Sequence, residues 1–149
     1  MLKSFATLIQ VAQDRTDHAA ARVGQLQARL SESQQKHTLL ENYRGEYRAR
    51  LEAATQRGAN AADMRNFRAF LDRLDEAVLQ QQTDVAFWRD QIDAARVNWQ
   101  SEQRSLNSYN TIAARRDNAA RVVQARREQK QQDEFAARSA GAARFAFGD

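Results

Sequence analysis

Apolar residues recur along most of the chain at alternating steps of three and four. A first run of sixteen such positions begins at Leu2 and ends at Ala54, and twelve of them are apolar. A second run of eighteen positions extends from Met64 to Val123, and fifteen of these are apolar. A stripe with this 3.5-residue period is typical of the a and d positions that join two helices in a coiled coil. We therefore expect an all-α protein built from two long helices, and we call these two runs the seam.

The segment between the two runs favours a reversal of the chain. Gly58 and Asn60 are turn residues, and Asp63 is a candidate N-cap of the next helix. A turn at this point makes an antiparallel pair in which the numbers of facing residues sum to about 118, so that Leu40 faces Val78. We predict a single coiled-coil domain over residues 1–149, with a first helix over about 2–55, a turn over about 56–62, a second helix over about 63–138 and a frayed tail over 139–149.

The second helix is longer than its partner. In the predicted register Leu2 faces Arg116, so the helix beyond Arg116 has nothing on the first helix to pack against. We call this part the overhang, and the expected fold is a long two-helix antiparallel coiled-coil hairpin with a C-terminal single-helix overhang. A helix without a packing partner is only marginally stable, so the overhang is expected to bind another molecule or to fray.

The composition agrees with long helices. The chain has no proline, and alanine, arginine and glutamine together account for 65 of its 149 residues. A mean hydropathy of -0.79 is too polar for a large globular core. No apolar run approaches the roughly 20 residues of a membrane span, and the start of the chain is too short and too soon interrupted for a signal peptide, so a cytoplasmic protein is expected.

The sequence offers little catalytic or metal-binding chemistry. Without cysteine there is no disulfide or thiolate, and no glycine-rich loop could cradle a phosphate. Asp14, Asp17 and His18 share a helix face, but such a cluster is usually a solvated surface. The acid pairs Asp75–Glu76 and Asp133–Glu134 lack a concave pocket of the kind that acid–base catalysis needs. We expect a protein that is not an enzyme and binds neither cofactor nor metal.

The seam has several polar positions, among them Ser33, and two of them, His37 and Gln81, face each other in the predicted register. His37 occupies an a position, where it is more plausibly a half-buried residue that sets the register than a catalytic base. Gln81 faces it in the predicted register, which supports this interpretation.

One side of the hairpin near the turn carries apolar residues beside the seam. Positions of this kind normally carry charges in coiled coils, so the residues either widen the core or form a docking surface, since exposed aromatic residues on a charged surface often bind partners. Tyr43, Phe70 and Ala77 occupy such positions, labelled g, next to Leu40, Tyr47 and Leu74 on the seam itself. We call these six residues the side patch.

The net charge of +4 admits two classes of partner. Twenty of the 23 cationic residues are arginine, which forms forked ion pairs readily, so a protein partner is at least as plausible as nucleic acid. A basic coiled coil that binds nucleic acid through the overhanging arginines is therefore an alternative. Against it, Asp133 and Glu134 interrupt the charge, and no aromatic stacking platform accompanies the arginines.

The order and spacing of several segments resemble a known family over nearly the whole chain. The segments are LLENYRGEYRARL at 39–51, NFRAFLDRLDEA at 66–77, Trp88, Trp99 and EQKQQDEFAAR at 128–138. Together they are similar to the FliJ family, the small coiled-coil component of the bacterial flagellar type III export apparatus. The resemblance implies a non-enzymatic stalk in the central hole of the hexameric export ATPase, promoting its assembly or activity. It also implies contacts with the cytoplasmic domain of the transmembrane export gate and with export chaperones.

The resemblance also implies two sets of binding residues. The gate-binding positions of the family fall on the side patch, whereas Lys36 and Gln81 stand where relatives would have glutamine and histidine. For the ATPase ring we expect contacts at the termini end, from Phe5, Ile9, Val122, Val123, Arg126, Arg127 and Phe135. The expected location is cytoplasmic, peripherally associated with the inner-membrane export apparatus, without direct membrane insertion. The equivalent stalk of an injectisome secretion system is the other alternative.

Overall fold

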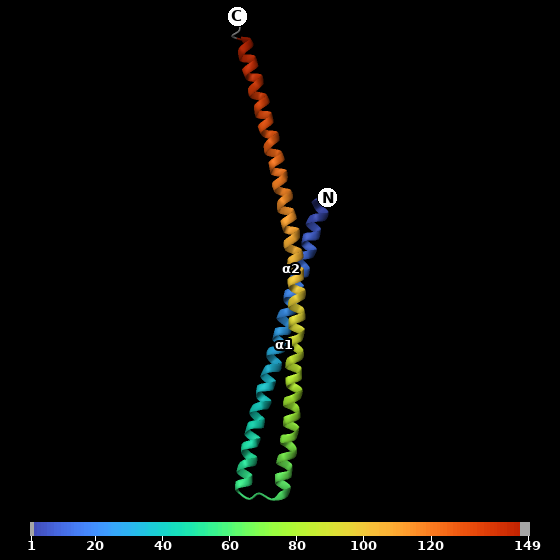
Figure 1. The fold of residues 1–149 in the computed structure, drawn as a ribbon, viewed down its shortest axis with the longest axis vertical. Helices are drawn as coiled ribbons and strands as arrows, with labels where there is room; N and C mark the ends of the chain where they lie inside the picture. The colour runs from blue at the N-terminus through green and yellow to red at the C-terminus, as the bar shows by residue number, and fades with distance from the viewer. Residues whose placement is uncertain (1, 147–149) are drawn as a thin grey trace. The chain divides into compact units, whose positions relative to one another are not determined.

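The computed structural model describes residues 2–146 and the side chains of residues 4–146. Two helices account for nearly all of this part: α1 spans Leu2–Gln56 and α2 spans Ala61–Ala146, and it contains no strand. Figure 1 shows the two helices joined by one short turn at their lower ends. The all-α prediction is therefore confirmed. Neither helix has a stretch long and apolar enough to cross a membrane within the described residues.

The turn between the helices is built by Gly58. Its φ of 72° is a left-handed conformation that residues with a Cβ rarely adopt. The Gly58 N–H donates to the Thr55 carbonyl at 3.2 Å and the Ala59 N–H donates to the Ala54 carbonyl at 3.0 Å. This pair of bonds is the Schellman motif, which satisfies the last carbonyls of α1 and stops the helix.

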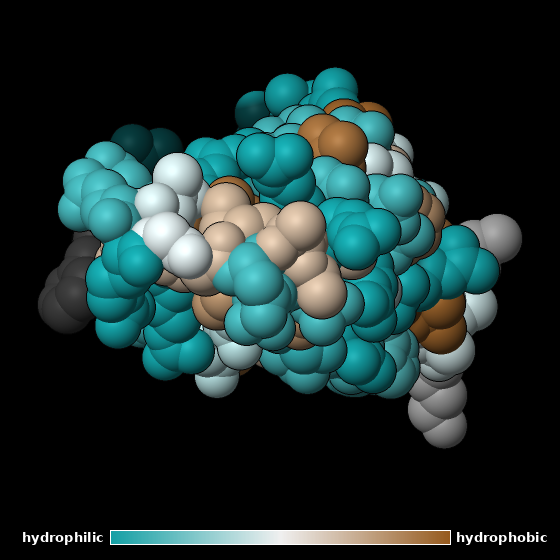
Figure 2. Space-filling model, turned by 90° about the horizontal axis from the view of Figure 1, so that it is seen from below, coloured by the Kyte–Doolittle hydropathy of each residue, from teal (hydrophilic) through white to brown (hydrophobic). Residues whose placement is uncertain are grey.

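The start of α2 is capped by Asn60 and not by Asp63. The Asp63 backbone N–H donates to Asn60 Oδ1 at 2.8 Å, so Asn60 is the N-cap and Asp63 lies in the first turn, where its charge favours the helix dipole. The predicted cap was therefore wrong by one turn, and α2 begins at Ala61. Viewed from this end, Figure 2 shows apolar atoms at the centre of a hydrophilic surface.

Residues 11–103 form one compact unit, in which the two helices pack antiparallel. All of its buried residues lie on the predicted seam, which confirms the seam as the core of this unit. Val78 is completely buried, whereas Thr16 satisfies its hydroxyl by donating to the Ala12 carbonyl at 2.8 Å. The buried residues are Ala12, Thr16, Ala19, Leu26, Ser33, Ala54, Leu71, Leu74, Val78 and Ile92.

Contacts between the helices confirm the register. The rings of Tyr47 and Phe70 lie 4.3 Å apart, and their residue numbers sum to 117. Ser33 bonds Asp84, which gives the same sum. Arg44 contacts Asp75, which gives 119. These values agree with the sum of about 118 that the seam predicts.

A second unit consists of residues 1–10 and 104–149. In it the Arg116 guanidinium lies 4.7 Å from the centre of the Phe5 ring, and Leu106 is buried. The predicted pairing of Arg116 with Leu2 concerns a side chain outside the described residues. That residues 1–149 form a single domain stays a prediction.

The overhang is helical over its described length. Every residue from 114 to 146 is exposed. The helix continues to Ala146, beyond the expected end near Arg138. Fraying of residues 139–146 stays a prediction. Alanine predominates in this stretch, and it is the residue with the highest helix propensity. Residues 147–149 of the predicted tail lie outside the described residues.

Candidate docking surfaces

The side patch combines buried, half-buried and exposed residues. Leu74 is 8% exposed and belongs to the core, whereas Tyr43 is 46% exposed. Leu40, Tyr47, Phe70 and Ala77 are half-buried. The two interpretations of the residues beside the seam therefore apply to different members, because Phe70 and Ala77 are partly covered and extend the core, whereas Tyr43 exposes its ring to solvent.

Tyr47 and Phe70 connect the two helices at this patch. Their rings are tilted by 42° at a centroid distance of 4.3 Å, and the Arg50 guanidinium lies 5.0 Å from the Tyr47 ring. Aromatic pairs in this geometry add about 0.5–1.5 kcal/mol beyond the area that they bury. Both rings also border a surface cavity of about 240 Å³ that includes Asn66 and Phe67. The patch thus has a rigid aromatic base and a concave edge.

The other side of the hairpin near the turn is held by charges. Arg44 and Arg48 both contact Asp75 Oδ1, at 3.5 Å and 3.4 Å. Glu41 Oε1 lies 4.0 Å from Arg44. Partly exposed ion pairs of this kind contribute at most about 1 kcal/mol each to the free energy of unfolding. They therefore orient the two helices more than they stabilise the fold.

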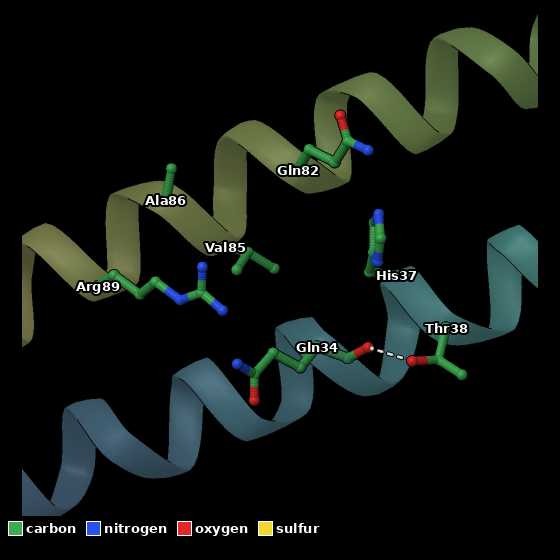
Figure 3. A pocket seen from close by; sticks show the side chains of 7 residues that line it. All are labelled: Gln34, His37, Thr38, Gln82, Val85, Ala86 and Arg89. Carbon is green, nitrogen blue, oxygen red and sulfur yellow. Dashed lines mark hydrogen bonds between the residues drawn. The ribbon is translucent and has the colours of Figure 1, made fainter.

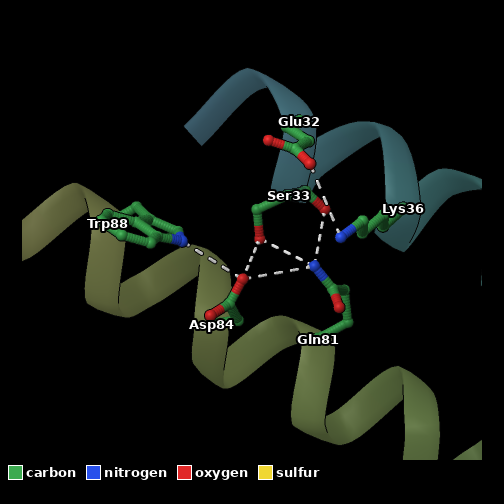
Figure 4. Close-up of polar contacts among 6 residues, drawn as sticks. All are labelled: Glu32, Ser33, Lys36, Gln81, Asp84 and Trp88. Atoms are coloured by element: carbon green, nitrogen blue, oxygen red, sulfur yellow. Dashed lines mark hydrogen bonds and ion pairs between the residues drawn. The ribbon is translucent and has the colours of Figure 1, made fainter. Parts of the chain in front are cut away.

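A polar layer interrupts the apolar seam at Ser33 (Figure 4). Ser33 is 3% exposed, and its hydroxyl donates to Asp84 Oδ2 at 2.7 Å. Gln81 Nε2 lies 2.8 Å from Ser33 Oγ and 3.0 Å from the Ser33 carbonyl, and the Trp88 indole N–H donates to Asp84 Oδ2 at 3.3 Å. The layer joins both helices through hydrogen bonds that only one register allows.

The polar layer changes the predicted role of Gln81 and adds two residues. The register still places Gln81 opposite His37, but the Gln81 amide bonds Ser33, one turn away from His37. The seam pattern marked Ser33 only as a polar interruption, and it gave no reason to single out Asp84, 51 residues away. A serine at a core position was the one available signal, because a buried hydroxyl needs a partner.

His37 is half-buried, with 23% of its side chain exposed, as expected. Its Nε2 lies 3.5 Å from Glu41 Oε1, yet the geometry provides no hydrogen bond to this buried nitrogen. Figure 3 shows His37 near Gln82 and Val85 of α2, with Arg89 beyond Val85. These residues and Gln34 border a cavity of about 450 Å³ between the helices.

The residues expected to contact a ring differ in how far they are exposed. Phe5 and Ile9 are half-buried, and Phe5 contacts Arg116. Val122, Val123 and Phe135 are 45%, 48% and 73% exposed. Arg126 and Arg127 are exposed as well. The overhang residues are thus available to a partner, whereas the two residues of α1 are partly covered within their own unit.

The Asp14, Asp17 and His18 cluster shows the expected surface character. All three are exposed, and Asp17 Oδ1 accepts a hydrogen bond from Gln13 Nε2 at 2.9 Å. Within residues 4–146 no group of three histidine or acidic side chains is placed to hold a metal ion.

Comparison with known proteins gives a consistent result over nearly the whole chain. Residues 1–144 match the family described as Flagellar FliJ protein. The Flagellar FliJ protein of Escherichia coli (strain K12) is 27% identical over 137 residues, which cover 92% of this chain and 93% of that protein. The Flagellar FliJ protein of Salmonella typhi is 28% identical over the same length and coverage.

Proposed function

The chain belongs to the FliJ family and is a component of the flagellar protein export apparatus, and from this premise we propose that it is the stalk of the export ATPase. In this proposal the termini end of the molecule enters the central hole of the ATPase hexamer and promotes its assembly or activity. The side patch binds the cytoplasmic domain of the transmembrane export gate, and the chain also contacts export chaperones. It performs no catalysis and is held at the inner membrane only through these partners.

The exposure of residues 114–146 is the observation that carries this proposal. Phe135 follows Val122 by thirteen residues, which places the two side chains about 140° apart around the helix at about 100° per residue. Apolar side chains on different faces of one helix suit a partner that surrounds it and are less suited to a partner that packs on one side. Three of the residues expected to contact the ring, Val122, Val123 and Phe135, are at least 45% exposed.

The charge of the overhang fits an acidic lining of such a hole. Residues 121–146 contain six basic and three acidic residues, which gives a net charge of +3. Long-range attraction between opposite charges raises the rate of encounter and then fixes orientation. Arg126 and Arg127 lie one helical turn after Val122 and Val123. A partner that contacts this part of the overhang therefore meets apolar and cationic side chains together.

A stalk without catalytic groups acts on an ATPase only through binding. A ligand shifts an equilibrium by the difference in its affinity for the two states. The overhang therefore stimulates the ATPase to the extent that it binds the assembled or active hexamer more tightly than the separate subunits.

Deleting residues 121–149 tests the ring contact. We expect the shortened chain to keep the melting temperature of the hairpin, because the removed side chains are exposed, and to lose stimulation of the cognate export ATPase. The measurements are a thermal melt by circular dichroism and ATP hydrolysis with and without the chain. Stimulation by the shortened chain equal to that by the full chain would falsify the assignment of the overhang as the ring-binding end.

Replacing Tyr43 by alanine tests the gate contact. An exposed anchor residue in a docking surface often contributes 2 kcal/mol or more to binding, so affinity for the cytoplasmic domain of the gate should fall by roughly thirtyfold. Leu79→Ala is the matched control, because Leu79 is 62% exposed and lies outside the patch. Equal affinities for the wild-type chain and the Tyr43→Ala chain would place the gate contact elsewhere.

A further inference from the structure

One flank of α1 carries a basic residue in nearly every heptad. The positions in question directly precede every second seam residue of α1, as Arg22 precedes Val23 and Arg29 precedes Leu30. Six consecutive positions of this kind follow Leu8 within α1, and the one that is not basic is Tyr43. The other five are all exposed, and we call them the basic flank: Arg15, Arg22, Arg29, Lys36 and Arg50.

The three members farthest from the turn have unpaired charges. Of the other two members, Lys36 is paired with Glu32 at 3.7 Å and Arg50 lies over the Tyr47 ring. Arg15, Arg22 and Arg29 form neither an ion pair nor a hydrogen bond within the described part of the chain. This differs from the opposite flank, where Arg44 and Arg48 share Asp75.

The residues of α2 that face Arg22 and Arg29 are uncharged. On this side of the helix pair, residues that directly precede seam positions face one another. Gln91 therefore lies opposite Arg29, and Asn98 lies opposite Arg22. Phe87 lies on the same side of α2 and is 49% exposed, with its ring in an edge-to-face contact with Trp88 at 5.1 Å. The facing wall is therefore uncharged and partly aromatic.

A cavity of about 430 Å³ lies where the two walls meet. Arg22 and Arg29 stand at its edge, and Leu26 and Trp88 form its apolar wall. The Trp88 N–H is already bonded to Asp84, so the indole presents an apolar ring to the cavity (Figure 4). Glu32 also borders the cavity, but its carboxylate is paired with Lys36.

We propose that this groove binds an acidic amphipathic helix of a partner protein, which packs as a third helix against α1 and α2. Arg22 and Arg29 are seven residues apart, which is about 10.5 Å along the helix. A helix lying alongside presents carboxylates with the same spacing at positions i and i+7, and an apolar side chain at i+3 or i+4 between them. Arginine binds carboxylates through two parallel hydrogen bonds, and the apolar side chain enters the cavity beside Trp88.

Several features favour an acidic helix over nucleic acid. The unpaired arginines form a single row, and carboxylates at 14, 17 and 32 lie on the same helix, where they would repel a continuous phosphate backbone. The groove shares no residue with the side patch, and it lies two to three heptads farther from the turn. The proposal is therefore independent of the stalk and gate assignments.

A designed peptide tests the groove on the full-length chain. The probe is a fluorescein-labelled helical peptide of about three heptads, with glutamates at i and i+7 and leucine at i+4. We expect binding in fluorescence anisotropy at low salt and, in a Trp99→Phe background, a change in Trp88 emission. The double variant Arg22→Gln with Arg29→Gln should weaken binding by about tenfold or more. Phe87→Ala should weaken it by several fold.

Matched controls separate a specific groove from general attraction. Arg68→Gln with Arg96→Gln removes the same charge from exposed positions outside the basic flank and should change affinity by less than about twofold. A peptide with lysine in place of both glutamates should not bind. Equal losses in the two double variants would overturn the proposal in favour of unspecific attraction. Tighter binding of random duplex DNA or phosphatidylserine vesicles, with the same dependence on Arg22 and Arg29, would overturn it in favour of another class of partner.

Discussion

Val78 and Val123 both lie on the predicted seam of α2, at an a and a d position, yet they have opposite environments. Val78 is completely buried against α1, whereas Val123 is 48% exposed. The helix itself continues through both positions without a break. The comparison shows that the pattern marks where a helix can be covered, and that burial requires a second segment at that place. The hairpin contains its own partner, and the overhang does not.

A buried charge should give the largest difference between the two regions. Val78→Asp places a carboxylate at a position without solvent access, and we expect it to lower the free energy of unfolding by about 3 kcal/mol or more. Val122→Asp, at a position that is 45% exposed, should change it by less than about 0.5 kcal/mol. Chemical denaturation followed by circular dichroism measures both. Equal losses would mean that the overhang is covered in solution.

Hydrogen exchange should separate the same regions without mutation. Amides near Val78 open only when the hairpin unfolds, whereas those of residues 121–146 open by local fraying of an uncovered helix. We expect exchange in the hairpin to be slower by at least about a hundredfold. Native-state exchange read by mass spectrometry provides the measurement. A second measurement with the export ATPase bound should show slower exchange in the overhang alone. Uniform exchange along α2 would contradict the comparison.

The polar layer should give an intermediate effect. Asp84→Ala removes the acceptor of the Ser33 and Trp88 hydrogen bonds, and a buried donor that loses its partner costs about 1–3 kcal/mol. Asp90→Ala is the control, since Asp90 is exposed on the same helix. The stability of both variants is measured by denaturation. If the two substitutions cost the same, the layer contributes nothing beyond an ordinary surface carboxylate.

The side patch should show the smallest effects, and they should differ between its two g-position aromatics. Tyr43→Ala removes an exposed ring and should cost less than about 0.5 kcal/mol. Phe70→Ala removes the ring that packs on Tyr47 and should cost about 1–2 kcal/mol, part of the 3–5 kcal/mol typical of a fully buried phenylalanine. Thermal melts of the two variants measure this difference. A larger loss for Tyr43→Ala would show that Tyr43 belongs to the core.

The helices, their antiparallel register and their core follow from sequence pattern alone. The seam runs contain all the residues that the hairpin buries, because a 3.5-residue period leaves one face of each helix apolar and these faces must meet. The turn could also be predicted from the sequence, because Gly58 adopts the left-handed conformation that ends α1 at little cost in free energy. The cap of α2 was missed because both Asn60 and Asp63 are good capping residues, and the choice depends on where the Schellman turn releases the chain.

Side-chain partners were decided by the tertiary structure. The heptad pattern places Gln81 opposite His37, yet the Gln81 amide bonds Ser33, because that residue offers both a hydroxyl and a carbonyl within reach. Asp84 joins the layer from a position beside the seam, since its carboxylate accepts from Ser33 across the helix pair. Likewise Phe70 is half-buried and Tyr43 exposed, although both precede a seam position. Heptad position determines which face a residue occupies, whereas the neighbouring helix determines which side chains find a partner on that face.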